Sequence, residues 1–197
     1  MSDVGSIGAL TPAARHRVVA GTFAEEVAAV TDWEAESPVQ GWTARDVVGH
    51  LVEWFPGFLA AGGVDLAPGP SVGDDPVRAW HVQTAGVQEL LDGPDAGATF
   101  RHPMAGEHRL ADAVDRFYTA DVFMHTWDLA AAGGRVAHLD PAYATQLLDG
   151  MRGIEDLLRS SGQYGPAVPV DPDADPVTRL MGFIGRDPSV AADATHG

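Results

Sequence analysis

The sequence contains no cysteine, and this absence excludes several kinds of chemistry. No disulfide can form, no thiolate can bind zinc, and no cysteine can act as a catalytic nucleophile. A protein without disulfides suits the reducing cytoplasm, where we expect this one to be. At 197 residues, of which 45% are hydrophobic, the chain is long enough to form a core, and we expect a single domain over residues 1–197.

The chain also lacks lysine and long apolar runs. Its 12 basic residues are all arginine, and against 28 acidic residues they give a net charge of −16. A negative charge of this size repels phosphate backbones, so we expect no nucleic-acid partner. No apolar run is long enough to span a membrane, and the first residues, "MSDVGSIGALTPAARHR", do not resemble a signal peptide. We therefore expect no membrane association.

Apolar residues recur at steps of three and four along most of the chain, which predicts an all-α protein. Thr43 followed by Asp46 has the spacing of a capping box, and Pro56 should kink the helix that follows or end it early. Residues 95–109 break the pattern and suggest an irregular segment with a small hairpin. The pattern favours a four-helix bundle with extra C-terminal helices. The predicted helices cover about 11–32, a segment from Thr43 onward, 75–92, 110–132, 141–160 and a short stretch within "DPVTRLMGFIGRDP".

A polar stripe runs along the otherwise apolar segment "DVFMHTWDLAAAGG" at residues 121–134. Asp121, His125 and Asp128 recur at i, i+4 and i+7, a spacing that stacks side chains on one helical face. A buried carboxylate is costly unless it is paired or bound to a metal. His50 is a second polar residue on an apolar helical face, between Val47 and Leu51.

Two interpretations of these residues remain open. His50 could be a core histidine that donates to a backbone carbonyl, and Asp121 with His125 could be a hydrogen-bonded pair within one helix. However, two helices that both present imidazole to one core would supply two histidines and a carboxylate. Three protein ligands with an open position are typical of a catalytic divalent-metal site. We therefore predict that His50, Asp121 and His125 converge on a metal.

The segments "GWTARDVVGHL" and "DVFMHTWDLA" resemble the two signature segments of the DinB-like superfamily. The branch they resemble most contains the metal-binding domain of mycothiol-dependent maleylpyruvate isomerase and related actinobacterial proteins. Trp42-Thr43, Trp127-Asp128-Leu129-Ala130 and the closing "LMGFIGRDP" extend the likeness over most of the chain. The resemblance implies an up-and-down four-helix bundle that holds a divalent metal through His50, Asp121 and His125, with Asp121 in place of the isomerase's glutamate.

Asp128 lies one turn beyond His125 and has two interpretations. It could accept the second N–H of that imidazole and fix its tautomer, or it could be a buried cap or form a bond between helices with an arginine such as Arg45. The tryptophans are expected in the core or in a pocket wall: Trp42, Trp54 and Trp127. Of the other histidines, His81 is a candidate pocket residue, whereas His102 and His108 are expected to be exposed or in loops.

The predicted metal suggests what the protein does. Zinc is the first choice of metal, with nickel, iron and manganese as alternatives. A metal with an open position can activate a bound water or a bound thiol, and without cysteine a thiol must come from a cosubstrate, for which the resemblance suggests mycothiol. Our first hypothesis is a metal-dependent thiol transferase or isomerase acting on a small electrophilic molecule. The alternatives are a metal-dependent hydrolase and a non-catalytic metal-binding or stress-response bundle, with a homodimer left open. Because no Glu-x-x-His motif occurs, a carboxylate-bridged dinuclear site is disfavoured.

Overall fold

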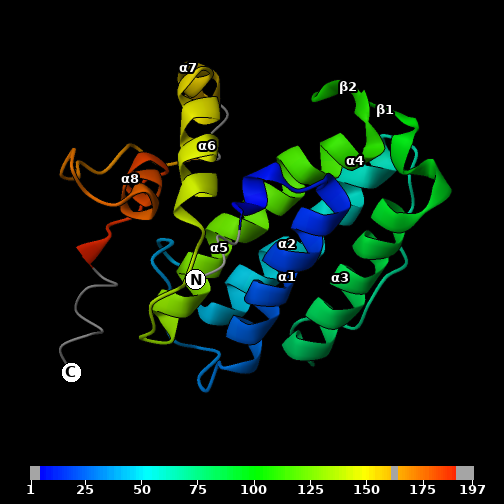
Figure 1. Cartoon of the computed structure of the whole chain (residues 1–197). Helices are drawn as coiled ribbons and strands as arrows, with labels where there is room; N and C mark the ends of the chain where they lie inside the picture. The colour runs from blue at the N-terminus through cyan, green and yellow to red at the C-terminus, as the bar shows by residue number, and fades with distance from the viewer. Residues whose placement is uncertain (1–4, 161–163, 190–197) are drawn as a thin grey trace.

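The computed structural model describes residues 5–160 and 164–189, which are mostly helical and include one small hairpin (Figure 1). This confirms the predicted fold class at that level. Within these ranges, no helix has both the length and the apolar character that crossing a membrane requires. The elements in chain order are η1 (Ile7–Ala9), α1 (Pro12–Ala28), α2 (Ala44–Ala61), α3 (Pro76–Asp92), η2 (Pro94–Gly97), β1 (Thr99–His102), β2 (Gly106–Arg109), α4 (Leu110–Ala113), η3 (Val114–Thr119), α5 (Ala120–Ala132), α6 (Pro141–Arg152), α7 (Glu155–Ser160) and α8 (Pro176–Phe183).

Apart from α5, the longer helices begin at capping side chains that can be predicted from the sequence. At the start of α2, the Thr43 hydroxyl accepts a hydrogen bond from the Asp46 N–H, and the Asp46 carboxylate accepts one from the Thr43 N–H. This confirms the predicted capping box. Four other helices begin with a capping residue followed directly by proline, whose fixed φ suits the first helical position. Their capping residues are Thr11, Asp75, Asp140 and Asp175.

Helices α1, α2, α3 and α5 form the main body of the protein. Both α1 and α2 pack against α3 and α5. The side chains between them include the fully buried Phe23, Phe55, Trp80 and Leu129. Burying a side chain of this kind contributes about 1.5–3 kcal/mol relative to leaving it exposed, so this packing fixes the relative positions of α2 and α5.

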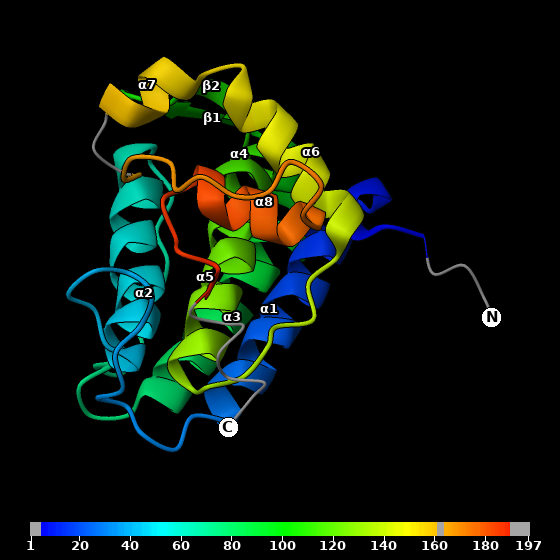
Figure 2. The ribbon, with the colours of Figure 1, turned by 90° about the vertical axis from the view of Figure 1, so that its left-hand side faces the viewer.

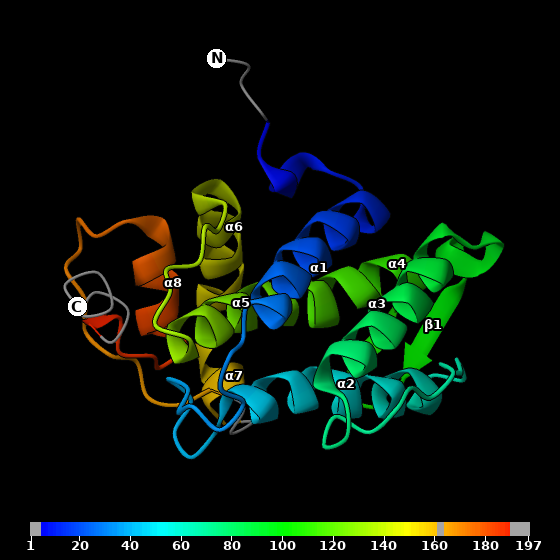
Figure 3. The ribbon, with the colours of Figure 1, turned by 90° about the horizontal axis from the view of Figure 1, so that it is seen from below.

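The C-terminal helices pack beside this body. Helices α6 and α8 contact each other and lie on the side of α5 that faces away from α3 (Figures 1 and 3). In the view of Figure 2, α2 and α1 lie on either side of α5, and α8 lies in front of α5. The chain beyond α8 therefore approaches the part of α5 that carries the polar stripe.

Two predicted helices were too long. The first ends at Ala28 instead of residue 32, because Asp32 accepts a hydrogen bond from the Glu34 N–H and so forms a local turn that competes with the helix. The predicted helix over 141–160 is divided into α6 and α7 around Gly153, since glycine is a poor helix former.

Two further expectations concern the long helices. Of the two effects expected of Pro56, a kink or an early end, the early end does not occur, because α2 continues to Ala61 and buries Leu59 in the turn beyond the proline. The segment 110–132 is not a single α-helix, because η3 within it is π-helical. In η3, Tyr118 stacks on Phe55 with ring centroids 3.9 Å apart, and Thr119 lies beside a histidine of α1. The wider π turn lets these adjacent residues reach partners on two different helices.

Candidate metal centre

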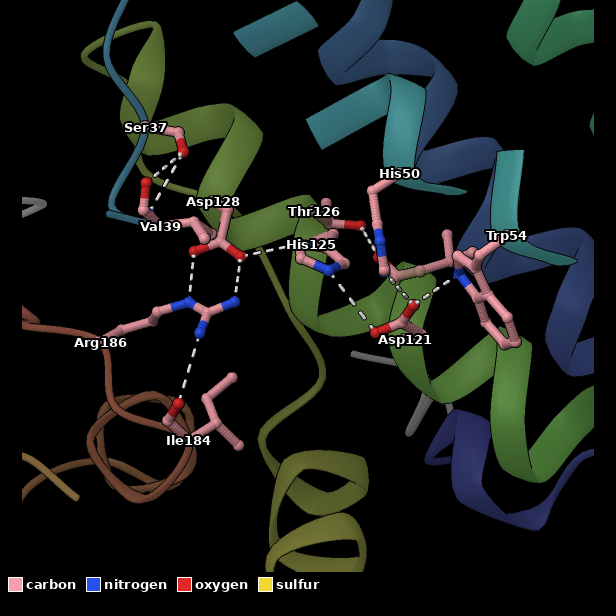
Figure 4. A network of polar contacts seen from close by, with 11 residues as sticks. Ser37, Val39, His50, Trp54, Asp121, His125, Thr126, Asp128, Ile184 and Arg186 are labelled. Carbon is pink, nitrogen blue, oxygen red and sulfur yellow. Dashed lines mark hydrogen bonds and ion pairs between the residues drawn. The ribbon is translucent and has the colours of Figure 1, made fainter. Parts of the chain in front are cut away.

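The structure brings His50, Asp121 and His125 together between α2 and α5 (Figure 4). His50 Nε2 lies 3.0 Å from Asp121 Oδ2, and His125 Nε2 lies 3.5 Å from Asp121 Oδ1. One potential ligand atom from each residue falls within 4.8 Å of the other two. The His125 side chain is 6% exposed, while that of His50 is 30% exposed, so the cluster can be reached from solvent on the His50 side.

Packing of the two helices explains this convergence. On α2, the fully buried Val47 and Leu51 flank His50 in sequence and anchor its face of the helix against the core. On α5, Asp121 lies in the first turn and His125 follows one turn later, on a helix that is buried on most of its surface. Because α2 packs against α5, the two faces meet.

Asp128 joins His125 to the C-terminal part of the chain. Its Oδ2 accepts a 2.9 Å hydrogen bond from His125 Nδ1, and its two oxygens accept bonds of 3.0 Å each from Nε and Nη2 of Arg186 (Figure 4). The structure thus contains both of the expected contacts, one to the imidazole and one to an arginine. The arginine is not Arg45, whose guanidinium instead contacts Glu34 and the carbonyl of Val72.

These contacts set the charge of the network. Burial alone would raise the pKa of Asp128, but the hydrogen bond and charge of His125, together with those of Arg186, outweigh it and lower that pKa. Burial alone would lower the pKa of His125, but the charge of Asp121 and the hydrogen bond to Asp128 raise it. Asp128 is therefore a carboxylate that holds the Nδ1–H of His125, which leaves Nε2 on the side of Asp121.

Two tryptophans lie against the cluster. The Trp42 ring is stacked on His125, with centroids 5.7 Å apart, and lies 5.0 Å from the His50 ring. Trp54 Nε1 donates a 3.2 Å hydrogen bond to Asp121 Oδ2. Burial, with the nearby charge of Asp121, raises the pKa of Tyr164.

Sequence reasoning anticipated only part of this surrounding layer. Trp42 and Trp54 were expected as wall or core residues, and the hydrogen bond that Trp54 donates was missed. Tyr164 and Arg186 were missed as well. A signal for Arg186 did exist, since a buried Asp128 requires a cation, but nothing local indicates which of the arginines supplies it.

The three other histidines singled out in the sequence lie outside the cluster. His81 is exposed on α3, so the structure does not support it as a pocket residue. His102 and His108 are half-buried in the hairpin, where they form local hydrogen bonds with backbone atoms. Among the described residues, only His50, Asp121 and His125 form a group of this kind.

The three residues fit a divalent metal by their donor atoms and spacing. Two imidazole nitrogens and a carboxylate oxygen are ligands that zinc, iron, nickel and manganese all accept. Donor atoms at about 2.0–2.2 Å from a tetrahedral zinc ion lie about 3.3–3.6 Å from one another. The two imidazole nitrogens approach different oxygens of Asp121, at 3.0 Å from Oδ2 and 3.5 Å from Oδ1, and one donor atom from each residue lies within 4.8 Å of the others.

The chain is similar to proteins of Mycobacterium tuberculosis. The chain is 30% identical over 155 residues to Uncharacterized protein Rv0738 of Mycobacterium tuberculosis (strain ATCC 25618 / H37Rv), an alignment that covers 76% of this chain and 82% of the relative. It matches Uncharacterized protein MT0763 of the CDC 1551 / Oshkosh strain with the same identity and coverage. No protein-family model matches the chain, and no solved structure matches it.

Proposed function

Because the chain belongs to the same family as Uncharacterized protein Rv0738 of Mycobacterium tuberculosis, whose name carries no activity, we propose a function from the site itself: the protein binds a divalent metal through His50, Asp121 and His125. The observation that carries this proposal is the convergence of three ligand atoms from two helices within 4.8 Å of one another. Zinc is the metal that we propose first, and nickel, iron and manganese are the alternatives. The resemblance of the two segments around these residues to DinB-like proteins supports the same assignment, and we propose a DinB-like bundle for α1, α2, α3 and α5.

The residues around the cluster have separate roles in this proposal. Asp128 holds the Nδ1–H of His125, so that Nε2 can be a ligand. Trp42 covers both imidazoles on one side and excludes water there, since its ring contacts each of them. The partial exposure of His50 leaves a path for a small molecule to reach the cluster.

The proposed chemistry is that of a thiol transferase or isomerase acting on a small electrophilic molecule. A divalent metal with an open position lowers the pKa of a water or thiol bound to it. Because the chain has no cysteine, the thiol would be a cosubstrate, and we propose mycothiol or a similar low-molecular-weight thiol. The mycobacterial origin of the relatives supports this choice, because mycobacteria are actinobacteria. Hydrolysis by a metal-bound water, or metal binding without catalysis, would be the function if no thiol binds.

Metal titration tests the first part of this proposal. Purified protein, stripped of metal, is titrated with Zn²⁺ against a chromophoric chelator, and we expect one equivalent to bind. His50→Ala and His125→Ala should each abolish stoichiometric binding because each removes a ligand. His81→Ala is the matched control, since it removes an exposed histidine outside the cluster and should bind zinc like the parent. Weak, substoichiometric binding by the parent, or an equal loss in His81→Ala, would contradict the metal site.

The thiol is tested on the cobalt-loaded protein. A thiolate bound to Co²⁺ produces an absorption band in the near ultraviolet that water or carboxylate ligands do not produce. Titration with a small thiol should generate this band, with saturation at one equivalent per cobalt. If cobalt binds but no band appears, the thiol chemistry is wrong, and the hydrolytic and non-catalytic alternatives remain.

A further inference from the structure

The buried carboxylate of Asp128 lies between two partners that are far apart in the sequence. Its side chain is fully buried, and that of Arg186 is 11% exposed. Arg186 donates to both oxygens from Nε and Nη2, the paired geometry in which a guanidinium binds a carboxylate most strongly. The same carboxylate holds His125. The contact is therefore a direct polar connection from the C-terminal segment to a proposed metal ligand.

The end of α8 fixes where Arg186 lies. The Arg186 N–H donates a 2.9 Å bond to the Met181 carbonyl, and Gly185 makes the required turn with φ of +91°. Only glycine adopts that conformation without strain, and a Cβ at Gly185 would also come within 3.0 Å of the Pro166 carbonyl oxygen. The guanidinium of Arg186 also donates from Nη1 to the carbonyl of Ile184, and this bond holds it against the end of α8. Arg186 is thus held by α8 and is not a freely moving surface side chain.

We propose that Arg186 is a positioning residue that couples the docking of α8 to metal affinity at the cluster. This inference rests on the proposed metal-binding function. Arg186 fixes both oxygens of Asp128, and Asp128 in turn fixes the ring orientation of His125. When α8 is docked, His125 Nε2 is held toward Asp121. When α8 is displaced, Asp128 loses the contacts that hold it, and the imidazole is free to rotate away.

Thermodynamic linkage makes this coupling reciprocal. If docking of α8 raises metal affinity, then metal binding must stabilise the docked α8 by the same factor. The C-terminal segment would therefore respond to metal, and any partner or cleavage that removes it would weaken the metal site. If Arg186 only stabilised the fold, metal binding would not stabilise the docked α8 through it.

Arg159 supplies a matched control for the test. It holds the same end of α8, because its Nη2 donates a 2.7 Å bond to the Phe183 carbonyl, its Nη1 donates to the Gly165 carbonyl, and its guanidinium lies over the Phe183 ring. No contact joins it to Asp128 within the described ranges. Arg159→Gln therefore removes other contacts of α8 while the bonds from Arg186 to Asp128 remain in place, whereas Arg186→Gln removes the connection to His125.

The experiment measures zinc affinity of the full chain by chelator competition in the parent, Arg186→Gln, Arg186→Lys and Arg159→Gln. We expect Arg186→Gln to weaken zinc binding about 10- to 100-fold, the usual effect of losing an outer hydrogen-bond partner of a ligand. Arg186→Lys keeps the charge but loses the paired geometry, so it should fall between Arg186→Gln and the parent. Arg159→Gln should bind within a fewfold of the parent. Arg186→Lys also provides the comparison if Arg186→Gln folds poorly, which circular dichroism will show.

Hydrogen exchange supplies the reciprocal readout. Zinc should slow exchange of the α8 amides in the parent and in Arg159→Gln, and this slowing should be lost in Arg186→Gln. Parent-like zinc affinity in Arg186→Gln, or an equal loss in Arg159→Gln, would overturn the inference while leaving the metal site intact. A parent protein that binds no zinc would overturn the proposed function, and the coupling with it.

Discussion

Trp54 Nε1 donates a 3.2 Å hydrogen bond to Oδ2 of Asp121, the same oxygen that lies 3.0 Å from His50 Nε2. The two side chains come from one face of α2, four residues apart, and both converge on a carboxylate of α5. Asp121 is 17% exposed on its side chain, so these bonds restrict a group that solvent would otherwise reorient. The indole thus orients a proposed metal ligand in the way that Asp128 orients His125.

This contact predicts the behaviour of Trp54→Phe. Phenylalanine keeps an aromatic ring beside Phe55 and Phe58 but removes the N–H donor, so Asp121 loses one orienting bond. We expect zinc affinity to fall about 10-fold, at the lower end of the range for outer partners of a ligand. Trp33→Phe is the control, since Trp33 lies under Arg45 and not at the cluster. Equal affinities in parent and Trp54→Phe, measured by chelator competition, would show that the bond does not matter for binding.

Asp128→Asn tests the other orienting bond. Asparagine keeps the size and one acceptor oxygen but removes the negative charge, so we expect zinc affinity to fall by about 10- to 100-fold without complete loss. The free energy of unfolding, measured in urea, should also fall by about 1–3 kcal/mol, because Arg186 would keep its charge without a carboxylate partner. If zinc binding stays at the parent level while stability falls, Asp128 serves only to tie α8 to α5. Complete loss, as in His125→Ala, would instead indicate that Asp128 itself is a ligand.

The sequence made the helix starts and the polar stripe predictable because their signals are local. Thr43 and Asp46 lie within one turn, so their reciprocal bonds can be inferred from spacing alone. Asp121 and His125 likewise share a helical face whatever the rest of the chain does. His50 required one further assumption, that α2 and α5 pack together.

The contacts that sequence reasoning missed are those between distant segments. Arg186 lies 58 residues beyond Asp128, and nothing in its neighbourhood distinguishes it from the other arginines as the partner. The π turn of η3 also depends on contacts between distant segments, because Tyr118 packs on Phe55 and Thr119 contacts α1. Tertiary packing overrides the local helical preference there, and a single sequence does not contain that information.

A last prediction concerns His16, which lies away from the cluster in the core. Its side chain is fully buried, its Nδ1 lies 3.1 Å from Thr119 Oγ1, and burial, with the nearby charge of Arg17, lowers its pKa to about 4. In the unfolded chain the pKa returns to about 6.5. Between these two values the unfolded state binds more protons than the folded state, so stability must fall as the pH decreases.

Urea unfolding at a series of pH values measures this effect. His16 should reduce the free energy of unfolding by about 2 kcal/mol between pH 7.5 and pH 5, with little further change once the pH is below about 4. His16→Gln, which cannot titrate, should lack this component, whatever its absolute stability at pH 7.5. Because all other titratable groups are shared, the difference between the two curves isolates His16. Parallel curves for parent and His16→Gln would show that the imidazole takes up a proton in the folded core as easily as in the unfolded chain, and the assignment of a neutral, buried His16 would then be wrong.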